Sequence, residues 1–146
     1  MFARPSTTER CSMPNETVKE WIAKAEGDFA VACREMRARK SRNYDAVCFH
    51  CQQCIEKLMK GLLIHVGVTP PKTHMLLVLD ELLGTACTEW SWPADELRFL
   101  SRAAVFLRYP GDSAGKEDAA EAMALAKRLR TCLLTLLNAE KEGDPS

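Results

Sequence analysis

The segment from Tyr44 to Lys60 separates apolar and polar positions onto two faces of a helix. At about 100° of rotation per residue, one face collects Val47, Cys51, Ile55, Leu58 and Leu62, with Tyr44, Cys48 and Met59 beside them. The opposite face carries His50, Gln53, Lys57 and, more loosely, Lys60. A helix with two such faces packs inward on the apolar one and presents the polar one. The polar face is therefore where we look for function.

Helical periodicity continues along most of the chain. We expect helices over residues 16–40, 44–66, 74–84, 93–108 and 116–140. Asn15 and Thr73 are typical N-caps, Gly84 suits the end of the third helix, and Pro93 suits the first turn of the fourth. The sequence shows no strand pattern. It predicts an all-α fold, an up-and-down antiparallel bundle of about five helices.

Length and composition fit one globular domain. The chain has 146 residues, zero formal net charge and 47% hydrophobic residues, so a core can close without disulfides or metal. Zero net charge gives no global attraction to nucleic acid or membranes, and no segment approaches the roughly 20 apolar residues of a membrane helix. We expect a flexible arm at 1–14, with Met13 as an alternative start to Met1, a domain at 15–141 and a tail at 142–146. The N-terminus lacks a signal-like apolar core, which predicts a cytoplasmic protein.

Three of the seven cysteines, Cys48, Cys51 and Cys54, lie three residues apart around His50. A metal site or a redox pair is one interpretation. Structural zinc sites, however, take Cys pairs from tight turns and add a second pair from elsewhere, whereas these cysteines lie within a predicted helix. We favour small, buried residues in a reducing compartment. We accordingly expect neither a metal nor a cofactor.

Six polar residues are candidates for ligand binding: His50, Gln53, Lys57, Lys60, His74 and Arg108. Imidazole titrates near neutrality and serves as a base or a phosphate ligand, and lysine and arginine bind phosphates. The alternatives are structural: a packed His50, solvated lysines with Lys60 paired to Glu56 on the surface, a capping segment at His74, and Arg108 at a helix C-terminus. No phosphate-binding glycine loop or serine nucleophile motif is present, so we assign no catalytic residue.

Other polar and aromatic residues have mainly structural interpretations. The basic run at residues 34–42 suits the negative end of a helix dipole, with phosphate contact as the alternative. Asp45 would bond to the turn at the start of its helix or orient His50. Trp21, Trp90 and Trp92 would pack in the core or at an interface.

Three motifs resemble those of HEPN domains. Tyr44-Asp45-Ala46, the segment from Cys48 to Lys57, and Lys60 resemble the signature helix of that family, in which the cysteine positions are commonly alanine. Thr73-His74 with the leucines after it resembles the second motif, and Arg108-Tyr109-Pro110 resembles the third. The motifs occur in order at plausible spacing, and the resemblance covers about residues 16–140.

The resemblance implies a bundle of five helices that forms a homodimer or a complex. Members of this branch often accompany a minimal nucleotidyltransferase, and nucleotide binding beside that enzyme is a role proposed for them. Another branch consists of metal-independent ribonucleases, many of them toxins, whose hallmark is Arg, four to six residues, then His. Here seven residues separate Arg42 from His50, and no Arg precedes His65 or His74 within that window. The ribonuclease motif is therefore absent by spacing.

The sequence thus favours a binding module for a nucleotide or for RNA phosphate that acts with a nucleotidyltransferase partner. A ribonuclease or toxin with a displaced Arg–His pair is the enzymatic alternative, although the missing motif argues against it. A structural adaptor that mediates assembly through apolar surface is the third hypothesis.

Overall fold

The computed structural model describes residues 14–105 and 110–138. Its helices are α2 (Glu16–Arg37), α3 (Tyr44–His65), α4 (Leu76–Ala86), α5 (Ala94–Val105) and α6 (Lys116–Leu137). Within these two ranges no strand occurs, and the predicted all-α helical bundle is confirmed. None of the described helices is both long and apolar enough to cross a membrane.

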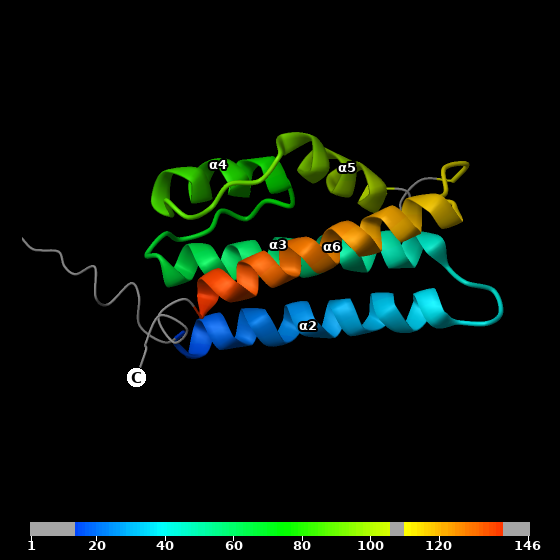
Figure 1. Ribbon diagram of the computed structural model, residues 1–146, viewed down its shortest axis with the longest axis horizontal. Helices are drawn as coiled ribbons and strands as arrows, with labels where there is room; N and C mark the ends of the chain where they lie inside the picture. Colours follow the sequence, from blue (N-terminus) through cyan, green and yellow to red (C-terminus); the bar gives the residue numbers. More distant parts are fainter. Residues whose placement is uncertain (1–13, 106–109, 139–146) are drawn as a thin grey trace, which may run out of the picture.

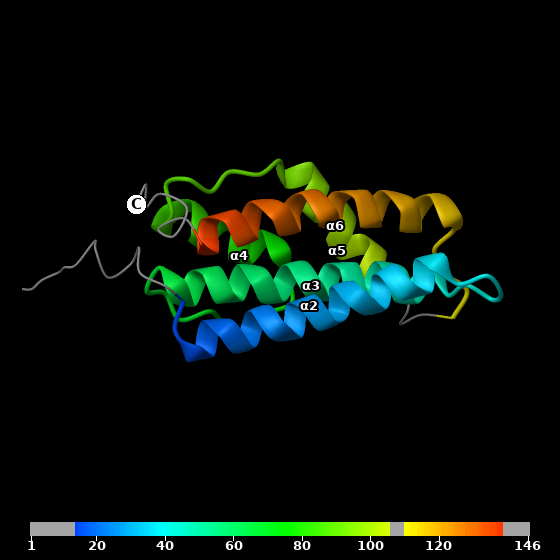
Figure 2. The same cartoon turned by 60° about the horizontal axis from the view of Figure 1, so that its bottom comes forward.

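Helix α3 lies at the centre of the bundle and packs against each of the other four helices. Figure 1 shows α4 and α5 along one side of α3 and α2 along the other. Figure 2 shows α6 and α2 on either side of α3 in the turned view. The predicted apolar face of α3, including Val47, Ile55 and Leu58, is fully buried. A central helix is covered on several faces, so polar residues of α3 are buried as well.

Asparagine side chains cap the N-termini of α2 and α3. Asn15 accepts a hydrogen bond from the backbone N–H of Val18 at 2.9 Å, as its predicted N-cap role requires. Asn43 does the same for Ala46 at 2.9 Å and so begins α3. Gly67, with φ of +91°, follows the last turn of α3 in a conformation that glycine adopts without strain.

Three predicted boundaries were wrong. Helix α2 ends at Arg37 rather than at residue 40. Helix α4 begins at Leu76 after Met75, which provides no side-chain cap. Thr73 instead accepts from the Met75 N–H at 3.1 Å and shapes the turn before the helix. Gly84 lies inside α4, because the burial of Leu83 offsets the roughly 1 kcal/mol that an interior glycine costs.

Several predicted features lie in residues that the structure does not describe. These are most of the arm at 1–14, the tail at 142–146 and the third motif residues Arg108 and Tyr109. The domain boundaries at 15 and 141 therefore stay predictions.

Candidate functional site

Two carboxylates organise the polar face of α3. Asp28 reaches it from α2, and Glu56 belongs to α3 itself. Each carboxylate binds one histidine and one lysine, which gives two neighbouring clusters along the helix. Neither carboxylate was among the six candidate ligand-binding residues.

The first cluster joins His50 and Lys57 through Asp28. The Nδ1 of His50 lies 2.8 Å from Asp28 Oδ1, and Lys57 Nζ donates to Asp28 Oδ2 at 2.6 Å. All three side chains are largely buried. The two predicted residues thus come together as expected for one helical face, but the charge of Lys57 is neutralised by a residue 29 positions away.

The second cluster converges on the buried carboxylate of Glu56. Lys60 Nζ donates to Oε2 at 3.0 Å, and His74 Nδ1 lies 3.0 Å from the same oxygen. The amides of Gln52 and Gln53 donate to Oε1 at 3.1 and 3.2 Å. The Glu56 and Lys60 side chains are only 4% and 9% exposed, so the expectation of a surface pair was wrong. Through His74, the loop before α4 lies against this cluster, and Trp21 of α2 lies against Lys60.

The environment of Glu56 favours its ionised form. Burial alone would raise the pKa of this carboxyl, but hydrogen bonds from Lys60, Gln52 and His74, together with the charge of Lys60, lower the pKa below its usual value. The Glu56 carboxylate is therefore negatively charged at neutral pH and holds its four donors in place.

Both histidines face a carboxylate with the same ring nitrogen. A carboxylate only accepts hydrogen bonds, so Nδ1 of His50 and of His74 carries the proton in each pair. This tautomer leaves Nε2 as an acceptor in the neutral ring. The His74 side chain is 71% exposed, whereas His50 is 27% exposed. His74 therefore offers its outer nitrogen to solvent more fully.

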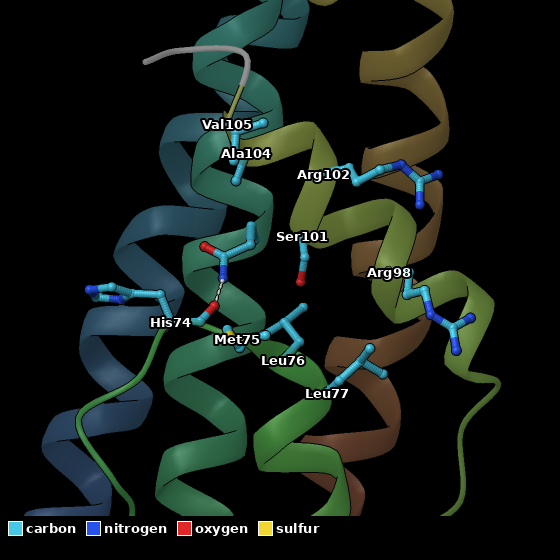
Figure 3. A pocket seen from close by; sticks show the side chains of 10 residues that line it. His74, Met75, Leu76, Leu77, Arg98, Ser101, Arg102, Ala104 and Val105 are labelled. Carbon is cyan, nitrogen blue, oxygen red and sulfur yellow. Dashed lines mark hydrogen bonds between the residues drawn. The ribbon is translucent and has the colours of Figure 1, made fainter. Parts of the chain in front are cut away.

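A pocket of about 400 Å³ opens beside the second cluster, between α3, α4 and α5. Its lining is mainly apolar with a polar edge: Gln52, His74, Met75, Leu76, Leu77, Arg98, Ser101, Arg102, Ala104 and Val105. Figure 3 shows the imidazole of His74 on the opposite side of this opening from the guanidinium groups of Arg98 and Arg102. The exposed large hydrophobic side chains among the described residues, Met75 at 60% and Val105 at 36%, both belong to this lining.

Gln52 connects the pocket to the Glu56 cluster. Its Nε2 donates to the His74 backbone carbonyl at 3.2 Å, the dashed line beside His74 in Figure 3. The same Nε2 also donates to Glu56 Oε1 at 3.1 Å. The sequence interpretation overlooked Gln52 because it counted only the outermost polar stripe. The signal was present in the spacing of Gln52, Glu56 and Lys60, which recur every four residues and so share one helical face.

Other residues of interest are structural in this arrangement. Asp45 accepts from the Ala114 N–H and so ties the start of α3 to the segment before α6. The observed partner is neither the turn at the start of its own helix nor His50, the two that we expected. Trp90 is buried and donates from its ring nitrogen to Asp80 at 2.8 Å. Trp21 lies under the ammonium of Lys60, 5.8 Å from it. Arg108 lies outside the described residues.

The cysteines of α3 are buried, as the small-residue interpretation predicted. Burial raises the pKa of Cys48 and of Cys54 to about 12, and that of Cys51 further still. Thiols with such pKa values are inert at neutral pH. Among the described residues no group of three His, Cys, Asp or Glu side chains is arranged to hold a metal ion.

Comparison with a protein-family model shows which family the chain belongs to. The HEPN domain model matches residues 18–137, from the first turn of α2 to the last residue of α6. The chain belongs to the HEPN family. The search for curated relatives found no match.

Two solved structures share this HEPN architecture. TT1696 from Thermus thermophilus is 22% identical, with a TM-score of 0.68 over 84% of this chain and 100% of its own. ST0689, described as an archaeal HEPN homologue, is 27% identical, with a TM-score of 0.55 over 86% of this chain and 96% of its own. The first supports the fold alone, and the second supports both the fold and the family.

Proposed function

We propose that this HEPN domain binds a nucleotide, or the phosphate of an RNA, and acts beside a nucleotidyltransferase partner. One observation carries the proposal: the pocket between α3, α4 and α5 combines an apolar wall with two guanidinium groups at its edge. Its volume of about 400 Å³ falls in the range of about 300–1,000 Å³ typical of small-molecule sites.

The two halves of a nucleotide fit the two halves of this lining. A base packs against the accessible apolar side chains of the lining, such as Met75, Leu77 and Val105, while phosphate oxygens accept from Arg98 and Arg102 in fork-like geometry. Arg102 has no ion pair within the described ranges. Arg98 pairs only with the exposed Asp95 at 2.8 Å, and such a surface pair is exchanged at little cost.

Five of the six predicted ligand-binding residues have a more indirect role in this proposal: His50, Gln53, Lys57, Lys60 and His74. Lys57 and Lys60 are already paired with Asp28 and Glu56, so they supply little net attraction for a phosphate. His74 remains the best placed of the five, because its exposed ring carries an acceptor that becomes a donor on protonation. Arg108 follows the pocket residue Val105 by three positions, and we keep it as a candidate phosphate ligand.

The assembly part of the proposal rests on the family. The resemblance implies a homodimer or a complex with a partner, and members of this branch often accompany a minimal nucleotidyltransferase. We extend both properties to this chain. Exposed Met75 and Val105 provide apolar surface at the edge of the pocket, and contiguous exposed apolar residues mark interaction sites in many proteins.

Isothermal titration tests the binding. ATP, GTP and a short RNA are titrated into the protein, with and without a co-purified nucleotidyltransferase, and saturable binding of at least one is expected. Arg102→Gln should weaken that binding by roughly tenfold, as loss of a charged hydrogen bond implies. Lys24→Gln is the control for loss of a positive charge, since Lys24 is exposed on α2, which does not line the pocket, and lies outside the basic run at residues 34–42. Absence of binding under every condition would overturn the proposal.

A ribonuclease is the second candidate, favoured by the two histidine–carboxylate pairs. Each pair fixes a tautomer with Nε2 as the acceptor, which is what a general base requires. Against it, Arg42 donates to the Ala38 carbonyl and makes no described contact with His50. Growth arrest on expression that disappears in a folded His50→Ala variant would favour this candidate. Lack of both arrest and RNA cleavage would eliminate it.

A further inference from the structure

A second pocket, of about 440 Å³, lies between α2 and α6 and shares no residue with the one described above. We name it the α2/α6 groove. Among the described residues, its lining comes from these two helices: Cys33, Met36, Arg37, Ala120, Met123, Ala124 and Lys127. The inference drawn from it is independent of nucleotide binding.

The floor of the α2/α6 groove suits the close approach of another helix. Ala120 and Ala124 are exposed and lie four residues apart, hence on one face of α6. Their short side chains allow a second helix to come near, because interaxial distance depends on the side chains at the contact. Met36 adds a flexible, partly exposed apolar side chain that can adapt to the shape of a partner. Met123 lies deeper, 7% exposed, and its sulfur accepts from Cys51 Sγ.

Two cations without carboxylate partners flank this apolar floor. Within the described ranges neither Arg37 nor Lys127 forms an ion pair, and both side chains are exposed. Lys127 is near enough to the floor that its charge acts to lower the pKa of Cys51, against the larger raising effect of burial. No carboxylate of the described ranges therefore neutralises either charge of the groove.

The register of the two helices sets the spacing of these cations. Glu26 and Arg130 form an ion pair at 2.7 Å, and α2 and α6 run in opposite directions (Figure 1). Lys127 precedes Arg130 by three residues and is therefore level with Phe29 of α2. Arg37 lies eight residues beyond that level, which corresponds to about 12 Å at the rise of an α-helix. The cations thus mark the two ends of the groove, about two helical turns apart.

We propose that the α2/α6 groove docks an amphipathic helix of another protein. Two acidic residues seven positions apart on that helix pair with Arg37 and Lys127. Apolar residues between them pack over Ala120 and Ala124 and against the two methionines. This is helix-in-groove recognition, in which anchors repeat at helical spacing on one face of the bound helix.

A second copy of this chain does not supply such a helix. The sequence has three acid pairs seven residues apart: Glu9 and Glu16, Asp28 and Glu35, Glu89 and Glu96. Pro14 and Pro93 interrupt the first and the last, and proline breaks a helix interior. Asp28 is bound to His50 and Lys57, and Glu35 accepts from the Asn43 N–H. The complementary helix therefore belongs to a different protein.

Fluorescence anisotropy with two designed peptides tests the proposal on the full chain. One helical peptide carries Glu at positions i and i+7 with Leu at i+3 and i+4, and the other replaces both Glu by Lys. The acidic peptide should bind saturably, and Arg37→Glu or Lys127→Glu should each weaken it roughly three- to tenfold. The double variant should prefer the Lys peptide. Lys24→Glu, an exposed change elsewhere on α2, should leave binding unchanged.

Three results would overturn the proposal: no saturable binding of the acidic peptide, equal binding of both peptides, or binding insensitive to both charge reversals. Analytical ultracentrifugation of the wild type and of Ala124→Glu tests the other occupant of the groove, a second copy of this chain. If Ala124→Glu abolishes self-association while no peptide binds, the groove is an interface between copies and the proposal is wrong. Circular dichroism confirms that each exposed substitution leaves the helices intact.

Discussion

At the scale of single residues, Glu56 is the most consequential side chain of α3. It is buried, ionised and bonded to Lys60, His74, Gln52 and Gln53. A buried charge is tolerated only where partners satisfy it. Through His74 and Gln52, this carboxylate also fixes the loop that forms one edge of the pocket. A change at Glu56 therefore alters both stability and the shape of the candidate site.

The two members of the buried ion pair should differ in how much their loss costs. Glu56→Gln leaves the Lys60 ammonium without a carboxylate, and we expect it to lower the free energy of unfolding by about 3 kcal/mol. Lys60→Met should cost less, since Glu56 keeps three other donors. Urea denaturation measures both. Glu16→Gln is the control, because the exposed Glu16–Lys19 pair contributes at most about 1 kcal/mol. Equal costs for the two buried substitutions would contradict this account.

The lowered pKa of Glu56 predicts a specific dependence of stability on pH. A carboxyl whose pKa is lower in the folded than in the unfolded protein contributes stability above its unfolded pKa. That contribution is lost as pH falls below the ordinary glutamate value of about 4.3 and through the folded pKa. Wild type should therefore lose more stability on acidification than Glu56→Gln does. If the free energies of unfolding of wild type and Glu56→Gln fell equally with decreasing pH, the pKa of Glu56 would not be lowered by folding.

At the scale of elements, sequence patterns predicted the helices better than their surroundings. The caps at Asn15 and Asn43 act locally, within three residues, so a one-dimensional pattern contains them. The start of α4 was misplaced because Thr73 bonds into a turn instead of the helix. Asp28 lies 22 residues before His50, and its role depends on how α2 packs against α3. Contacts of that kind follow from tertiary packing, which periodicity does not specify.

Alanine substitutions at Gly27 and Gly61 distinguish the effect of helix propensity on stability from that of helix–helix packing. A Cβ at Gly61 of α3 would lie 3.3 Å from Trp21 Cβ of α2, whereas a Cβ at Gly27 meets nothing within 4 Å. Gly27→Ala should stabilise by about 0.5–1 kcal/mol through helix propensity alone. Gly61→Ala gains the same propensity but crowds the interface, and a net loss of roughly 1 kcal/mol is expected. Thermal unfolding of both variants decides it; stabilisation by Gly61→Ala would mean that the two helices separate easily.

At the scale of the whole molecule, contacts between distant segments close the bundle around α3. Asp45 binds the Ala114 N–H across 69 positions, and Arg130 binds Glu26 across 104. The second contact joins α2 to α6 directly. These two helices otherwise pack mainly against α3 and little against each other. It lies on the same two helices that line the α2/α6 groove, so it helps to hold the two walls of that groove together.

The Glu26–Arg130 contact should contribute more than an ordinary surface pair. Arg130 donates from Nε to Glu26 Oε2 at 2.9 Å and from Nη2 to Oε1 at 2.7 Å, and its guanidinium lies 4.6 Å from the Phe29 ring centre. Two-point geometry and a cation–π contact both limit the entropy lost in holding the pair. A double-mutant cycle of Glu26→Gln and Arg130→Met should give a coupling of about 1 kcal/mol, reduced at high salt. The exposed Arg98–Asp95 pair, measured in the same way, should give a smaller value. A coupling near zero would mean that α6 is held against α2 by its contacts with α3 alone.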